Sequence, residues 1–309
     1  MPSDLVQPRI EGALTLPDGR RLGFVEFGPA RGRAVFWFHG TPGARRQIPD
    51  AARIAAHARG VRLIGIDRPG VGLSTPHLYD RIIDWADDFA VVADHLGVDE
   101  CGLIGLSGGG PYALACCAAL PHRIAAAAVL GGVAPTKGTD ARTGGLVGRT
   151  ACFAPLLTRL RTPAELGLAS FVWAIRPFGS QVYALYARIS PEGDRRVFAR
   201  PETKAMLLDD IRTGSRPGMR APVLDLLLFW RPWGFSLRDL RVPLHFWHGD
   251  ADNIVPLAHG EHMASLVPGA TLSVRPGESH LGGFGAADEV LDVLFQMWDT
   301  RSPPLTMQG

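Results

Sequence analysis

Length, composition and charge exclude several classes of protein. The chain has 309 residues, 46% hydrophobic and 20% charged, which predicts a well-buried core in one large domain with an insertion, or in two domains, and excludes wholesale disorder. The formal net charge is +2 and the arginines are scattered, which disfavours a nucleic-acid-binding protein.

The first half of the chain alternates short apolar segments with longer amphipathic ones. Pro17-Asp18-Gly19 is a turn signal that predicts an antiparallel hairpin at the start. We expect strands at 13–16, 21–27, 35–38, 62–66, 102–106 and 125–130, and helices at 48–58, 82–96 and 111–120. This alternation of buried strands and helices is typical of a mostly parallel, doubly wound α/β sheet.

The alternation stops after Pro135 and resumes near residue 242. Between these points we expect helices at 145–160, 163–175, 201–211 and 221–230, and beyond them strands at 244–247 and 271–274 with helices at 258–266 and 286–298. The sequence therefore predicts an α/β core of residues 1–135 and 242–301 with an inserted helical cap of residues 136–241. Residues 302–309 show no pattern, and we expect a disordered tail there.

Signals for export, membrane insertion or metal binding are absent from the sequence. The first seven residues include Asp4 and do not resemble a secretory signal, and the longest apolar runs are too short to span a bilayer. The four cysteines show neither CxxC nor Cys/His spacing, and adjacent Cys116 and Cys117 suit a buried helix. We expect a cytoplasmic protein with reduced thiols, no metal, no cofactor and no stable membrane insertion.

Ser107 is the candidate nucleophile. It lies in Gly-Leu-Ser-Gly-Gly, between the apolar segment 102–106 and a predicted helix, so we expect it on a very tight strand-to-helix turn. Gly105 and Gly109 leave room for such a turn because they carry no side chain. The alternative is a phosphate-binding glycine-rich turn, but no lysine follows to meet a phosphate.

Residues 39–43, His-Gly-Thr-Pro-Gly, follow the strand predicted at 35–38. A loop at this place can offer a backbone N–H opposite the nucleophile. We nominate the amides of Thr41 and Gly108 as the two donors of an oxyanion hole. The side chain of His39 is expected to make a structural hydrogen bond rather than to react.

A serine nucleophile needs a histidine base and an acid that orients the histidine. His280 follows the last predicted strand, where a loop can carry it over the sheet. The segment 248–256 offers two acids after the preceding strand, and we prefer Asp252 while keeping Asp250 as the alternative. The chain order Ser, Asp, His is the order of a triad on an α/β-hydrolase sheet.

With these motifs the chain resembles the α/β-hydrolase superfamily, and most closely bacterial and plant hydrolases that pair HGTPG with GxSGGGPYALA. Residues 67–74, DRPGVGLS, resemble the family's D-x-x-G-x-G-x-S turn, whose roles there are mainly structural. The acid loop at Asp252 and the histidine loop at His280 match as well. Ser107 stands where epoxide hydrolases and haloalkane dehalogenases carry aspartate, which disfavours chemistry at a carboxylate.

The resemblance implies that the cap covers the active site. The cap's aromatic residues are Phe153, Phe171, Trp173, Phe178, Tyr183, Tyr186, Phe229, Trp230, Trp233 and Phe235. Together they predict an apolar pocket. We therefore expect a serine hydrolase, carboxylesterase-like, that cleaves an ester or related acyl bond of a small apolar substrate.

Other functions remain open on the same fold. The chain could be a catalytically idle ligand-binding protein, or a triad enzyme that hydrolyses carbon–carbon bonds or performs perhydrolysis. An aminopeptidase is disfavoured, because the loop reads HGTPG rather than HGGPG. The cap also has only three glutamates with which to hold a substrate amine.

Overall fold

The computed structural model describes residues 5–216 and 218–300, and within them the central element is a sheet of eight strands in the order β1-β2-β4-β3-β5-β6-β7-β8. The strands are β1 (Ile10–Thr15), β2 (Arg21–Phe27), β3 (Ala34–Phe38), β4 (Arg62–Ile66), β5 (Cys101–Leu106), β6 (Ile124–Leu130), β7 (Leu244–Gly249) and β8 (Thr271–Arg275). Strands β1 and β2 form the predicted antiparallel hairpin, β2 is antiparallel to β4, and all further pairs are parallel. The predicted α/β fold class is confirmed.

Helices cover both faces of the sheet because its strands are apolar on both sides. Along β3, Phe36 and Phe38 pack with α2 (Trp85–His95), α3 (Gly110–Ala119) and α11 (Leu257–Leu266). The alternate residues Val35 and Trp37 pack with α1 (Asp50–Ala58) and α13 (Ala287–Thr300) on the other face. The two core clusters therefore follow the two-residue period of the strands.

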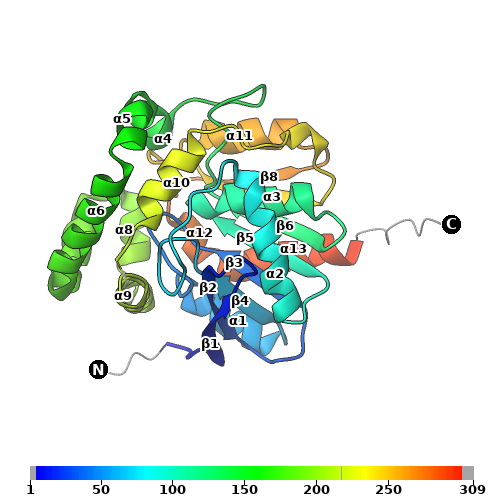
Figure 1. Ribbon diagram of the computed structural model, residues 1–309. Helices are drawn as coiled ribbons and strands as arrows, with labels where there is room; N and C mark the ends of the chain where they lie inside the picture. Colours follow the sequence, from blue (N-terminus) through cyan, green and yellow to red (C-terminus); the bar gives the residue numbers. More distant parts are fainter. Residues whose placement is uncertain (1–4, 217, 301–309) are drawn as a thin grey trace.

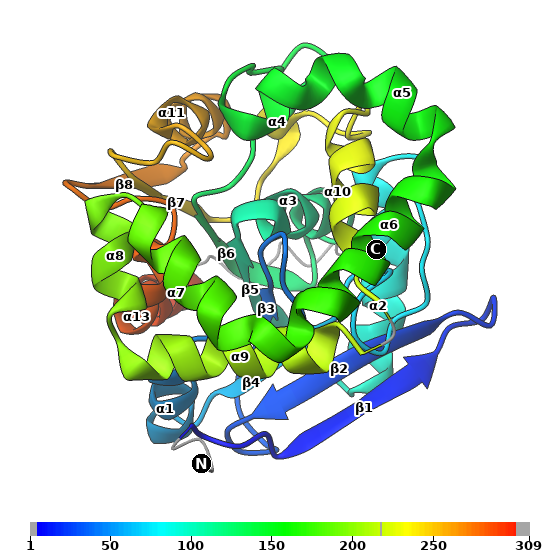
Figure 2. The ribbon, with the colours of Figure 1, turned by 90° about the vertical axis from the view of Figure 1, so that its left-hand side faces the viewer.

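Residues 136–241, which we call the cap segment, join β6 to β7. Their helices are α4 (Gly145–Thr150), α5 (Ala154–Arg159), α6 (Arg161–Ile175), α7 (Gly179–Ile189), α8 (Glu192–Phe198), α9 (Pro201–Gly214) and α10 (Ala221–Phe229). They gather at one side of the molecule (Figure 1). Figure 2 looks onto that side and shows α4–α9 arranged around the region of β3, β5 and β6.

The sequence analysis was wrong about two parts of the cap segment. The expected helix 145–160 is divided into α4, a 3₁₀ turn at Ala151–Phe153 and α5, because Pro155 lies in the first turn of a new helix rather than inside one. Helices α7 and α8 were not predicted; α8 is only seven residues long and contains Gly193, whereas α7 has no proline and no glycine after its first residue.

Two further expectations concern the termini and membranes. The predicted tail 302–309 lies outside the described residues. Among the residues that are described, no helix combines the length and the hydrophobicity needed to cross a bilayer.

Candidate active site

Ser107 lies between β5 and α3 on the predicted tight turn. Its φ is +49°, and among the described residues it is the only residue other than glycine with a positive φ. A Cβ on Gly109 would lie 2.2 Å from the Phe38 carbonyl oxygen, and one on Gly105 would lie 2.8 Å from the Gly109 carbonyl oxygen. The strained backbone at Ser107 is therefore held by neighbours that must be glycine.

Ser107, His280 and Asp252 form a continuous chain of hydrogen bonds. Ser107 Oγ lies 2.7 Å from His280 Nε2, and His280 Nδ1 lies 2.7 Å from Asp252 Oδ2. The second carboxylate oxygen of Asp252 accepts the backbone amides of Ile254 and Val255, each at 2.9 Å. All three predicted triad residues are buried, and the fold brings them together from positions far apart in the sequence.

The environment of Asp252 keeps its carboxylate ionised. Burial alone would raise the pKa of Asp252, but contacts with His248 and His280 and the Val255 amide hold that pKa well below its usual value. An ionised Asp252 accepts a hydrogen bond from the Nδ1–H of His280, so Nε2 carries no proton and can accept a hydrogen bond from the Ser107 hydroxyl. This is the tautomer that a histidine base requires.

Asp250, the alternative acid, occupies a different place. Its side chain is exposed and accepts the Gly277 amide at 2.8 Å, so it shapes the loop that leads to His280. His248 donates from Nε2 to the Val255 carbonyl at 2.7 Å, and this nitrogen is 3.5 Å from Asp252. The sequence analysis had not identified His248 as a neighbour of the acid.

The two residues nominated for the oxyanion hole lie against each other beside Ser107. A Cβ on Gly108 would come within 2.3 Å of Thr41 Oγ1, and one on Gly40 would be 3.6 Å from Ser107 Cβ. The loop after β3 is therefore packed directly onto the turn after β5. The role of these two amides in binding an oxyanion stays a prediction.

Comparisons with known proteins identify the fold family that the chain resembles. The model of the alpha/beta hydrolase fold family matches residues 33–146. A bifunctional esterase/perhydrolase from Acinetobacter calcoaceticus is 27% identical over 87% of this chain and 92% of its own length. A non-heme haloperoxidase from Rhodococcus erythropolis is 29% identical over 86% of this chain and 92% of its own length. The chain has the α/β-hydrolase fold.

Among solved structures, an esterase from a Rhodococcus species superposes on this chain with a TM-score of 0.68. It is 23% identical, and the match covers 93% of this chain and 99% of the esterase. At this identity the likeness concerns the fold, and it extends over nearly the whole of both chains.

The side chain of His39 holds the loop after β3 to the turn after β4. His39 Nδ1 donates to the Gly40 carbonyl at 2.8 Å, and Nε2 accepts the backbone amide of Arg68 at 3.2 Å. Burial, followed by the nearby Arg68 charge, lowers the pKa of His39 well below its usual value, so the imidazole is neutral and can accept. The structure thus gives His39 the structural hydrogen bonds that were expected.

The buried side chain of Gln47 also holds this loop. Gln47 Oε1 accepts the Gly40 amide at 2.6 Å, and Gln47 Nε2 donates to the Pro42 carbonyl at 3.0 Å. The side-chain amide therefore fixes the backbone on both sides of Thr41. The sequence analysis had stopped at residue 43 and missed it.

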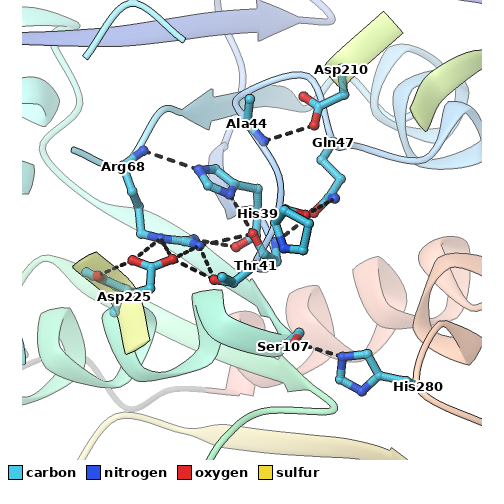
Figure 3. Close-up of polar contacts among 12 residues, drawn as sticks. His39, Thr41, Ala44, Gln47, Arg68, Ser107, Asp210, Asp225 and His280 are labelled. Carbon is cyan, nitrogen blue, oxygen red and sulfur yellow. Dashed lines mark hydrogen bonds and ion pairs between the residues drawn. The ribbon is translucent and has the colours of Figure 1, made fainter. Parts of the chain in front are cut away.

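Three buried carboxylates of the cap segment also contact the active-site loops. Asp194 on α8 accepts the amide of Leu281, which follows His280, at 2.8 Å. Asp210 on α9 accepts the Ala44 amide at 2.9 Å, and Asp225 on α10 accepts the Thr41 hydroxyl at 2.6 Å, as Figure 3 shows. A signal was present in the sequence, because Asp225 is the only charged residue of α10.

The cap aromatics named in the sequence analysis differ widely in exposure, and Tyr183, Tyr186 and Phe235 lie between the two extremes. Phe229, Trp230 and Trp233 are buried, and the Phe229 ring would be 3.2 Å from a Cβ on Gly108. Phe153, Phe171, Trp173 and Phe178 are more than half exposed. The aromatic residue that the structure places beside the turn after Ser107 is Phe229.

Proposed function

We propose that the protein is a serine hydrolase that cleaves carboxylic esters of small, largely apolar substrates through an acyl-enzyme on Ser107. The observation that carries the proposal is the hydrogen-bonded chain from Ser107 through His280 to Asp252. The esterase activity named for the Acinetobacter relative supports the same reaction class.

Acylation follows from the order of these contacts. Ser107 Oγ attacks the carbonyl carbon of the ester while its proton passes to His280 Nε2. The carbonyl oxygen becomes an oxyanion that the Thr41 and Gly108 amides stabilise. The tetrahedral intermediate then collapses, the carbon–oxygen bond to the alcohol breaks, and His280 returns its proton to the departing alcohol.

Deacylation repeats the sequence with water. His280 Nε2 takes a proton from a water molecule, whose oxygen attacks the acyl carbon on Ser107. Collapse of the second intermediate releases the carboxylic acid and returns the proton to Ser107 Oγ. Asp252 keeps its charge throughout and stabilises the imidazolium that forms in each half-reaction.

The apolar character of the substrate is inferred from the surroundings of Gly108. Phe229 lies against it, and Tyr112 and Phe229 are in edge-to-face contact with ring centroids 6.3 Å apart. Such a lining disfavours charged groups next to the reacting carbonyl and keeps bulk water from the oxyanion.

The decisive experiment replaces Ser107 with alanine. Turnover of short p-nitrophenyl esters should fall by at least about a thousandfold, because the nucleophile is lost, while the thermal midpoint stays near that of the native protein. A fluorophosphonate probe should label native protein at Ser107 and leave Ser107→Ala unlabelled.

Ser265→Ala, an exposed serine on α11, is the matched control and should retain both activity and labelling. Undiminished turnover by Ser107→Ala would remove the assignment. Absence of an adduct on the native protein would favour an idle ligand-binding protein on the same fold.

Perhydrolysis is the second candidate, because one relative is named an esterase/perhydrolase and another a haloperoxidase. Hydrogen peroxide would replace water in deacylation, so that the acyl group leaves Ser107 as a peracid. An assay with acetate ester and peroxide that measures peracid against acid would separate the two reactions. Both require the same acyl-enzyme.

A further inference from the structure

We propose that Asp225 of the cap segment, acting with Arg68, is a positioning residue that holds the two segments of the oxyanion hole against each other. The inference rests on the proposed function, since it assigns these residues to the hole formed by Thr41 and Gly108. It concerns a network of buried side chains that joins α10 to the loop after β3 and to the helix after Ser107 (Figure 3).

The carboxylate of Asp225 bridges the two segments directly. Its Oδ2 accepts the Thr41 hydroxyl at 2.6 Å, and its Oδ1 accepts the Tyr112 hydroxyl at 2.6 Å. Thr41 belongs to the loop that would supply one amide of the hole, and Tyr112 belongs to α3, which begins just after Gly108. One side chain of the cap segment therefore fixes both partners.

Arg68, in the turn after β4, completes the network. Its Nη2 donates to Asp225 Oδ2 at 2.8 Å, to Thr41 Oγ1 at 2.8 Å and to the Gly40 carbonyl at 3.0 Å. Its Nη1 donates to the His39 carbonyl, and its guanidinium lies 4.9 Å from the centroid of the Tyr112 ring. The Arg68 and Asp225 side chains are 1% and 2% exposed, so water does not compete for these contacts.

These bonds determine the orientation of the Thr41 side chain. Its hydroxyl donates to Asp225 and accepts from Arg68, so the rotamer is fixed by two charged partners. The hydroxyl occupies the space where a side chain on Gly108 would begin. A change in the Thr41 rotamer would therefore change the spacing of the loop from Gly108.

Stability alone is a weak reason for such a pair. Two charges buried in an apolar setting lose their hydration, and this cost offsets most of their mutual attraction. An oxyanion hole, by contrast, depends strongly on position, because its donors must lie about 2.7–3.1 Å from the developing charge. The benefit of the network is then the geometry that it imposes on the hole.

The test compares Asp225→Asn with Glu165→Gln. Asparagine has only one accepting oxygen and no charge, so it cannot accept from the Thr41 and Tyr112 hydroxyls through two oxygens or pair with Arg68 as a carboxylate does, while the size of the side chain is kept. Glu165 is the matched control, because it is a buried cap carboxylate whose ion pairs are with Arg161 at 2.6 Å and Arg220 at 3.8 Å, both in the cap segment. Native protein and both variants are assayed with p-nitrophenyl acetate.

We expect Asp225→Asn to lower kcat about 10- to 100-fold with KM changed less than about threefold, and Glu165→Gln to leave both near native values. Affinity for a trifluoromethyl ketone, which forms a tetrahedral oxyanion on Ser107, should fall by the same factor as kcat/KM. The pH midpoint of kcat/KM should not move, because His280 and Asp252 are untouched.

Thr41→Val is a second route to the same answer should Asp225→Asn fail to fold. It removes the hydroxyl, leaves the Arg68–Asp225 pair intact, and should reproduce the loss in kcat. The double variant should lose little more than either single variant, since both break one linkage.

Two outcomes overturn the inference alone: unchanged kcat in Asp225→Asn and Thr41→Val with normal fluorophosphonate labelling, or equal losses in Asp225→Asn and Glu165→Gln. Native protein that neither hydrolyses esters nor reacts with the fluorophosphonate overturns the proposed function, and this inference with it.

Discussion

At the scale of single residues, the pKa values of two buried aspartates are shifted in opposite directions for physical reasons that can be separated. The pKa of Asp252 is held low because its contacts with two histidines and a backbone amide outweigh burial. Asp210 on α9 is fully buried, and burial together with the nearby Asp67 raises its pKa to about 7. In the described part of the chain, no hydrogen-bond partner is seen for its Oδ1.

The stability of Asp210→Asn relative to the native protein should therefore increase as pH rises. Near pH 4 and below, Asp210 is protonated in both native and unfolded protein, but between about pH 4 and 7 only the native state keeps the proton. The stability that protonated Asp210 contributes to the native state is thus lost as pH rises through that window. The amide side chain of the variant does not titrate, so the variant has no such loss. In urea unfolding, the free energy of unfolding of the variant relative to that of the native protein should increase by about 2 to 4 kcal/mol between pH 4 and 7.5. A difference that stays constant over this range would contradict the raised pKa.

At the scale of elements, the turn from β5 into α3 depends on glycines, because a side chain at these positions would collide with neighbouring atoms. Gly109 lies against the carbonyl oxygens of Phe38 and His39, at the end of β3 and the start of the loop that follows it. These are backbone atoms of the central sheet, so they cannot move aside as a flexible side chain could. The turn and the neighbouring loop are one packed unit.

Gly109→Ala should therefore destabilise the protein by about 3 kcal/mol or more and reduce esterase activity, because the added methyl would displace β3 or the turn. Gly167→Ala is the control: it lies within α6, and its Cβ would meet nothing within 4 Å. That change should raise stability by roughly 0.5–1 kcal/mol, since alanine favours a helix. Chemical denaturation of both variants gives the comparison, and equal effects would refute the steric argument.

At the scale of the whole molecule, the cap segment has an inner and an outer part. Helices α8–α10 send buried side chains to the active-site loops and the core, among them Asp194, Asp210 and Asp225. No residue of α5 or α7 is buried, and Glu165 is the only buried residue of α6. The outer helices are thus attached mainly by partly exposed contacts.

Hydrogen exchange should reveal this division. Backbone amides of α5–α7 should exchange at least about tenfold faster than those of α8–α10, because opening the outer helices exposes little buried surface. Mass spectrometry of peptic peptides after brief labelling would measure it. Uniform protection across the cap segment would indicate that its helices open as one unit.

Much of the fold and of the candidate triad could be predicted because the relevant signals are local. The apolar run that ends at Leu106 and the glycines around Ser107 specify a strand, a tight turn and a helix through neighbouring residues alone. Asp252 and His280 could be selected because each follows a strand whose end reaches the same edge of the sheet. The boundaries of the cap helices were harder, since prolines and glycines interrupt their periodicity.

The amino-acid sequence by itself determined the alternation of strands and helices, the tight turn at Ser107 and the loops after strands that carry Asp252 and His280, because each depends on residues close together in the chain. Only the tertiary structure decided which cap residues reach the active site. Asp225 is 184 residues from Thr41 and 113 from Tyr112. Such contacts depend on how a whole inserted segment folds back over the sheet, and no local pattern of side chains encodes that path.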